Sequence, residues 1–227
     1  MENKTMESQK FAGDTKISGS LLSKYEQEIT KKYVSKIPKY IETHHLTLTT
    51  ILWSLLIIVF SYLAKGDINW LWLVSLMIFF QYITDLFDGA VGRFRKTGLI
   101  KWGYYMDHFL DYIFLCSIII GYSFILPDHF KYLLLLILTI FGAFMVNSYL
   151  SFAATNEFKI YYLKLGPTEI RIMFILINTM LVVFGKTYLG ATLPYILGLS
   201  LLGLVIVVYR TQKYIWKIDM SKKIKKK

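Results

Sequence analysis

Six long apolar blocks constrain the fold of this 227-residue chain more than any other feature of its sequence. A helix needs about 20 mostly apolar residues to cross a bilayer. The blocks are Leu46–Ala64, Asn69–Phe87, Tyr104–Leu126, Phe130–Phe152, Thr168–Gly185 and Thr192–Tyr209. Only 18% of the residues are charged, against about 25% in soluble domains. The sequence therefore predicts an all-α integral membrane protein with six transmembrane helices, and it excludes a soluble globular domain and a disordered chain.

The basic residues are distributed unevenly between the two sides of this predicted bundle. The net charge is +11, and placing both termini in the cytoplasm puts 23 of the 26 Lys and Arg residues on the cytoplasmic side. The other three are Lys65, Lys131 and Lys186, one in each outer loop. This distribution obeys the positive-inside rule in every loop. It predicts cytoplasmic termini and gives no indication of nucleic-acid binding.

The residues before the first block divide into two parts. Residues 1–18 are polar, and we expect a disordered tail. Apolar residues then recur at three- and four-residue spacing; they are Leu22, Tyr25, Ile29, Tyr33 and Ile37. The spacing predicts an amphipathic helix on the cytoplasmic leaflet, with a helix packed on the bundle as the alternative. The predicted organisation is a tail (1–18), an interfacial helix with its connector (19–45), a six-helix transmembrane catalytic domain (46–210) and a basic cytoplasmic tail (211–227) that meets anionic membrane lipids.

Four aspartates lie within the second and third blocks, near the cytoplasmic side. Asp85 and Asp88 are three residues apart, and Asp107 and Asp111 are four apart. Each pair therefore shares one face of its helix. Because a short loop joins the two helices, the four carboxylates can converge. Carboxylates at membrane depth are costly and are candidates for function.

This arrangement favours a divalent metal ion as the counter-charge. Four ionised carboxylates cannot share a partly dry site without one. The chain has a single cysteine, Cys116, so a Cys-based metal cluster is excluded. Oxygen ligands alone favour Mg²⁺ or Mn²⁺, and two carboxylates from each helix suit a pair of ions on a phosphoryl group. Gly89 leaves room for close backbone approach, and Arg93 can pair with phosphate oxygens.

Three other interpretations account less well for the four aspartates. Interhelical ion pairs would need a similar number of bases, and most nearby bases are loop residues at the water surface. A cation transporter would more often spread its carboxylates along a pathway at mid-depth. A non-catalytic scaffold would not depend on Asp107. Clustering at the cytoplasmic ends of two adjacent helices favours an enzyme.

The spacing of these residues resembles the signature of the CDP-alcohol phosphotransferase family. That signature reads D-x-x-D-G-x-x-A-R, eight or nine residues, then G-x-x-x-D-x-x-x-D. The chain has Asp85, Asp88, Gly89, Gly92, Arg93, Gly103, Asp107 and Asp111 at the fixed positions. Seven of the eight match, and Gly92 replaces the usual alanine with another small residue. The resemblance also covers the six-helix core, from about residue 20 to residue 210.

The resemblance implies a chemistry and a set of roles. A CDP-linked donor would bind with its pyrophosphate on two metal ions, and an acceptor hydroxyl would displace CMP. Asp85, Asp88 and Asp107 resemble metal ligands, and Asp111 resembles a further ligand, a base, or both. Asp85, Gly89 and Arg93 resemble donor-binding residues. The family also implies a homodimer, and we expect a multi-pass protein of the bacterial inner membrane whose active site faces the cytoplasm.

Two further features resemble the choline/ethanolamine phosphotransferase branch, in which CDP-choline or CDP-ethanolamine donates to diacylglycerol. His108 directly follows Asp107 and shares a helix face with Asp111, so it is a second candidate base. Glu157 and Glu169 resemble possible substrate contacts of that branch, although a helix cap is the simpler role for Glu169. The alternative is a CDP-diacylglycerol-dependent phosphatidyltransferase that acts on glycerol phosphate, inositol phosphate or serine.

Overall fold

The described residues, 22–96, 99–156 and 166–224 of this computed structural model, are helical and contain no β-strand. The α-helices are α1 (Ser23–Tyr33), α2 (Thr43–Leu63), α3 (Leu71–Arg95), α4 (Ile100–Ile125), α5 (Lys131–Thr155), α6 (Pro167–Phe184) and α7 (Thr187–Ile224). Short 3₁₀ turns precede α3 and α5 and follow α1. The predicted all-α fold class is confirmed.

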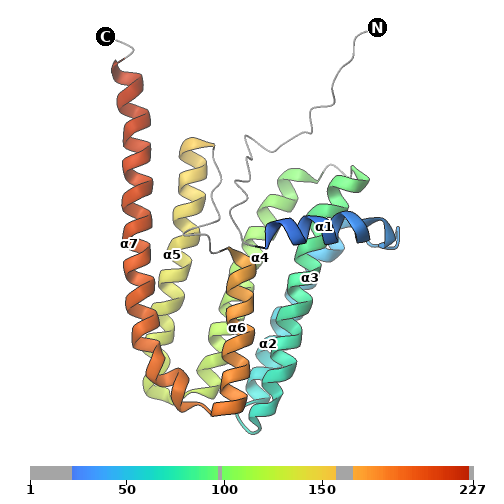
Figure 1. Ribbon diagram of the computed structural model, residues 1–227, viewed down its shortest axis with the longest axis vertical. Helices are drawn as coiled ribbons and strands as arrows, with labels where there is room; N and C mark the ends of the chain where they lie inside the picture. Colours follow the sequence, from blue (N-terminus) through green and yellow to red (C-terminus); the bar gives the residue numbers. More distant parts are fainter. Residues whose placement is uncertain (1–21, 97–98, 157–165, 225–227) are drawn as a thin grey trace.

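Helices α2 to α7 stand side by side as a bundle (Figure 1). All six are long and apolar enough to cross a membrane. Their outer surfaces remain apolar, and Leu55 and Leu199 are 57% and 71% exposed. An apolar surface of this extent is costly in water but matches lipid tails. The described part of the chain is therefore the membrane-spanning body of a multi-pass membrane protein.

The site-bearing helices are longer than the apolar blocks suggested. Helix α3 continues eight residues past Phe87 and ends at Arg95, where Lys96 adopts a left-handed conformation with φ 55°. Helix α4 begins at Ile100, four residues before the predicted Tyr104. The aspartates therefore lie inside regular helix, because polar residues facing a shared site extend a helix beyond its lipid-facing stretch.

Helix α7 shows the largest difference from the expected boundaries. The sixth block was predicted over Thr192–Tyr209, yet the helix runs from Thr187 to Ile224 and takes in much of the expected tail. Pro194 lies inside it rather than at its start. A proline is tolerated inside a membrane helix when neighbouring groups satisfy the freed carbonyl.

Helix α1 lies crosswise over one end of the bundle (Figure 1). Its apolar side chains Tyr25, Ile29 and Tyr33 stay exposed, as expected for a helix that rests on a membrane surface. The connector from α1 to α2 is fixed by Arg95 of α3. The Arg95 guanidinium donates hydrogen bonds to the backbone carbonyls of Ile37, Pro38, Lys39 and Ile41.

Close packing and one polar network hold the transmembrane helices together. A Cβ added to Gly121 of α4 would lie 2.4 Å from Ser61 Oγ of α2, so glycine permits this close approach. In the same interior, Tyr122 donates a 3.0 Å hydrogen bond to Asn178 of α6, which donates to Ser75 of α3 at 3.1 Å. These contacts hold α2, α3, α4 and α6 together in the part of the bundle away from the aspartates, because Ser61 and Gly121 lie near the ends of α2 and α4 while Asp107 and Asp111 lie near the start of α4.

Candidate active site

Three of the four predicted aspartates converge from α3 and α4. Asp85, Asp88 and Asp107 each offer a carboxylate oxygen, and these oxygens all lie within 4.8 Å of one another. Asp88 is 9% exposed, and the other two are partly buried. The residues fit a hard divalent ion, because three carboxylates this close repel one another and oxygen ligands suit Mg²⁺ or Mn²⁺. We call these three residues the aspartate triad.

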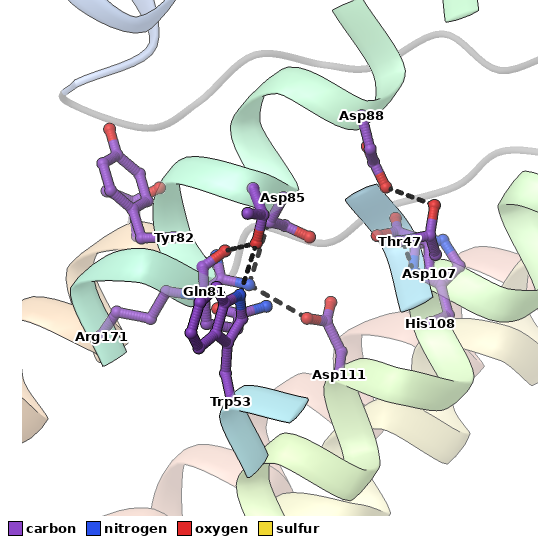
Figure 2. Close-up of polar contacts among 12 residues, drawn as sticks. Thr47, Trp53, Gln81, Tyr82, Asp85, Asp88, Asp107, His108, Asp111 and Arg171 are labelled. Atoms are coloured by element: carbon purple, nitrogen blue, oxygen red, sulfur yellow. Dashed lines mark hydrogen bonds and ion pairs between the residues drawn. The ribbon is translucent and has the colours of Figure 1, made fainter. Parts of the chain in front are cut away.

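A third helix orients one member of the triad. Thr47 of α2 donates a hydrogen bond of 3.0 Å from Oγ1 to Asp88 Oδ2 (Figure 2). Thr47 is 3% exposed, and its Oγ1 also lies 3.1 Å from the Thr43 carbonyl oxygen. The bond fixes one oxygen of a carboxylate that belongs to the triad. Sequence reasoning missed Thr47, because a lone threonine in an apolar helix carries no distinguishing pattern.

The fourth aspartate, Asp111, meets a buried cation. Arg171 of α6 places its Nη2 atom 3.0 Å from Asp111 Oδ1 and 3.0 Å from Asp85 Oδ2 (Figure 2). Arg171 is 4% exposed. From the sequence alone, it counts only among the 23 basic residues predicted on the cytoplasmic side. The missed signal was its position inside an apolar block, where a charged residue indicates function.

Gly89 and Arg93 adjoin each other beside the triad on α3. A Cβ added to Gly89 would lie 3.2 Å from Arg93 Nη1, so the guanidinium lies over the glycine backbone. Arg93 is exposed. A Cβ on Gly103 of α4 would meet no described atom within 4 Å. Gly89 and Arg93, two of the predicted donor-binding residues, therefore lie next to each other. The backbone at Gly103 is open to close approach by a ligand.

His108 packs between aromatic side chains of α4 and α5. Its Nδ1 lies 3.7 Å from Asp107 Oδ2. The ring meets Tyr104 edge-on at 4.6 Å between centroids and lies 5.7 Å from the Tyr149 ring. Tyr149 also donates its hydroxyl hydrogen to the His108 backbone carbonyl at 3.2 Å. His108 therefore contacts the triad, with its ring held in place by α5.

Hydrogen bonds cap the N-terminus of α6 and connect its first turn to α1. Glu169 accepts a 2.8 Å hydrogen bond at Oε2 from the Gly166 N–H, which is the capping role that the sequence suggested as the simpler one. Glu26 of α1 accepts from Thr168 at 2.7 Å and from Tyr82 of α3 at 3.2 Å. Glu157, the other predicted substrate contact, lies outside the described residues.

One buried amide lies near these charges without a partner of its own. Gln81 is fully buried one turn from Asp85 on α3, and its side-chain atoms make no hydrogen bond to the described residues. The Arg171 Nε atom is likewise buried without a described partner. Buried polar groups are normally satisfied, so this end of the bundle carries hydrogen-bonding capacity beyond its internal contacts.

A family model for CDP-alcohol phosphatidyltransferase matches residues 43–209. No match was found among the curated proteins or among the solved structures. The matched region contains α2 to α6 and most of the transmembrane part of α7. The chain therefore belongs to the CDP-alcohol phosphatidyltransferase family, whose members transfer a phosphate group from a CDP-alcohol in phospholipid synthesis and are typically dependent on divalent metal ions.

Proposed function

We propose that this protein transfers a substituted phosphate from a CDP-linked alcohol to an acceptor hydroxyl and releases CMP. The observation that carries the proposal is the aspartate triad, which brings together Asp85, Asp88 and Asp107 from two helices of the matched region. Oxygen ligands favour Mg²⁺ or Mn²⁺. Such an ion, when bound, neutralises negative charge on the phosphoryl and leaving-group oxygens.

The donor-binding role falls to the α3 residues beside the triad. Arg93 is exposed and its guanidinium lies over Gly89, so it can pair with phosphate oxygens that approach this backbone. Asp85, itself a member of the triad, lies on the same helix as Gly89 and Arg93.

Asp111 is our candidate for the base that removes the proton from the acceptor hydroxyl. It lies one turn beyond Asp107 on α4, on the same face of the helix. His108 remains the second candidate. Its contact with Asp107 and its packing against Tyr104 and Tyr149 favour a positioning role instead, because a base must reach the substrate.

For the substrates, we propose CDP-ethanolamine or CDP-choline as donor and diacylglycerol as acceptor. The support is the Asp107–His108 pair and the Pro167–Glu169 start of α6, both similar to the choline/ethanolamine branch. The alternative donor is CDP-diacylglycerol, with a soluble alcohol as acceptor. We further propose a homodimer in a bacterial inner membrane, with the triad facing the cytoplasm, on the basis of the family and of the positive charges.

The test is a donor comparison with the purified full-length protein in lipid nanodiscs. Mg²⁺ or Mn²⁺ is supplied with each donor and its acceptor, and the lipid product is identified by mass spectrometry. We expect product from CDP-ethanolamine or CDP-choline with diacylglycerol. Product only from CDP-diacylglycerol with a soluble alcohol would contradict our choice of substrates, and no CMP release with any donor would contradict the family activity.

The Asp107→Asn variant links that activity to the triad. It keeps the size of the side chain and removes the charge, so we expect a roughly hundredfold to thousandfold loss of product, the range typical of a lost electrostatic group. The matched control is Asp219→Asn, at an exposed aspartate of α7. Wild-type activity in the Asp107→Asn variant would remove the triad from the mechanism.

A further inference from the structure

Arg171 lies within the carboxylate cluster, not at its rim. Its Nη2 atom is 3.0 Å from an oxygen of Asp85 on α3 and 3.0 Å from an oxygen of Asp111 on α4. One nitrogen atom thus bridges two carboxylates from two helices, as Figure 2 shows. A metal ion shared by two ligands has the same connectivity, with shorter distances of about 2.0–2.1 Å for Mg²⁺.

The four carboxylates therefore form two adjoining cation positions that share Asp85. The first is the triad, where all ligand atoms are carboxylate oxygens within 4.8 Å of one another. The second lies between Asp85 and Asp111 and contains the Arg171 guanidinium. Asp111 thus has a cation partner that is part of the protein.

The surrounding residues hold Arg171 in this position. It is 4% exposed, and its guanidinium carbon lies 5.7 Å from the centre of the Phe114 ring. One turn earlier on α6, Thr168 is hydrogen-bonded to Glu26. An arginine stays protonated in proteins, so this charge cannot be lost by titration. Moving it into water would break both of its ion pairs, with Asp85 of α3 and Asp111 of α4.

We propose that Arg171 takes the place of a second divalent ion, so that this protein uses one metal ion at the triad and a guanidinium between Asp85 and Asp111. The inference rests on the proposed function, because it concerns the same site. It differs from the pair of ions that the family resemblance implies. A second divalent ion would have to displace a buried, permanently charged group, since both would need the same two carboxylates.

The number of bound ions tests this inference without any catalytic step. The full-length protein in detergent is titrated with Mn²⁺, and free Mn²⁺ is measured by electron paramagnetic resonance. We expect one tightly bound Mn²⁺ per wild-type chain. The Arg171→Gln variant should bind two, because Asp85 and Asp111 lose their internal cation and a divalent ion becomes the available counter-charge.

Two further variants serve as controls. Arg171→Lys keeps the positive charge and should bind one Mn²⁺ per chain. Arg210→Gln removes an exposed charge from α7 and should also leave the number at one. Two ions per wild-type chain would overturn the inference, and so would one ion in both the wild type and Arg171→Gln.

The Asp111→Asn variant gives a second test that leaves the buried arginine in place. It should retain one bound Mn²⁺, because on our inference Asp111 is paired with Arg171 and holds no ion. Loss of that ion would overturn the inference even if Arg171→Gln failed to fold. A wild type that binds no Mn²⁺ would overturn the proposed metal dependence as well, whereas two ions would overturn the role of Arg171 alone.

Discussion

Thr47 is the residue whose contribution to the triad can be isolated most cleanly. Replacing it with valine keeps the shape of the side chain and removes the hydrogen bond to Asp88. A hydrogen bond to a charged group contributes about 1.5–3 kcal/mol. We therefore expect the Mg²⁺ concentration for half-maximal activity to rise by roughly tenfold or more in Thr47→Val. The measurement is product formation against Mg²⁺ concentration.

Thr49→Val is the matched control for this change. Thr49 lies on the same helix, and its hydroxyl donates a 2.6 Å hydrogen bond to the Leu46 carbonyl oxygen of its own helix rather than to the triad. Its Mg²⁺ dependence should match that of the wild type, and Thr47→Ser should recover much of the loss. An unchanged Mg²⁺ dependence in Thr47→Val would show that the hydrogen bond does not orient Asp88 for metal binding.

The residues of the site were only partly predictable from sequence. Asp85, Asp88 and Asp107 could be found because their spacing on adjacent helices fixes which faces they share. Thr47 and Arg171 could not, because they come from α2 and α6, and no sequence spacing connects those helices to the aspartates. Arg171 in particular was treated as one of many surface cations, whereas the fold turns it inward.

At the scale of elements, the contact of α1 with the bundle depends on Glu26. Its carboxylate accepts hydrogen bonds from Tyr82 of α3 and Thr168 of α6. Glu26→Ala removes both, and we expect the backbone amides of α1 to exchange hydrogen several-fold faster, because a helix held by few contacts opens at low free energy. Hydrogen exchange with mass spectrometry measures this directly. Glu28→Ala, at an exposed position on the same helix, is the control, and equal exchange in the two variants would contradict the role of Glu26.

The close approach of α2 and α4 gives a second test at this scale. In Gly121→Ala the new Cβ would meet Ser61 Oγ at 2.4 Å and Ser61 Cβ at 2.9 Å. Overpacking of this kind costs about 1–3 kcal/mol, so we expect a lower thermal unfolding midpoint in detergent.

The paired change Ser61→Gly with Gly121→Ala moves the small residue to the other helix and should restore most of the loss. Gly198→Ala on α7 is the control, because a Cβ there meets no described atom within 4 Å. An unfolding midpoint in Gly121→Ala equal to that of Gly198→Ala would mean that α2 and α4 can separate without cost.

Element boundaries were less predictable than element number. Hydropathy indicates where a helix faces lipid, so it predicted all six spans. It placed the end of the second span at Phe87 and the end of the sixth at Tyr209, which is too early in both cases. The helices continue to Arg95 and Ile224, because their last turns face the site or water and need no apolar residues. Pro194 was expected to start a helix and instead lies within α7.

The charge distribution predicts the orientation of the whole molecule in the membrane, and this prediction can be measured. Lys101 lies next to the triad end of the bundle, and Lys65 follows α2 at the opposite end. The sequence predicts that 23 of the 26 basic residues lie on the Lys101 side, and the positive-inside rule then predicts that this side faces the cytoplasm. The triad would then face the compartment that supplies cytidine nucleotides.

Single-cysteine variants in a Cys116→Ala background report this orientation. We expect Lys65→Cys to react with a membrane-impermeant maleimide in intact bacterial spheroplasts, and Lys101→Cys to react only after lysis. Both side chains are exposed at helix ends, so a difference between them reflects the membrane and not burial within the protein. The reverse pattern would place the triad outside the cytoplasm. It would also mean that the positive charge on the Lys101 side does not determine the membrane orientation. That charge would then serve contact with anionic substrates or lipids.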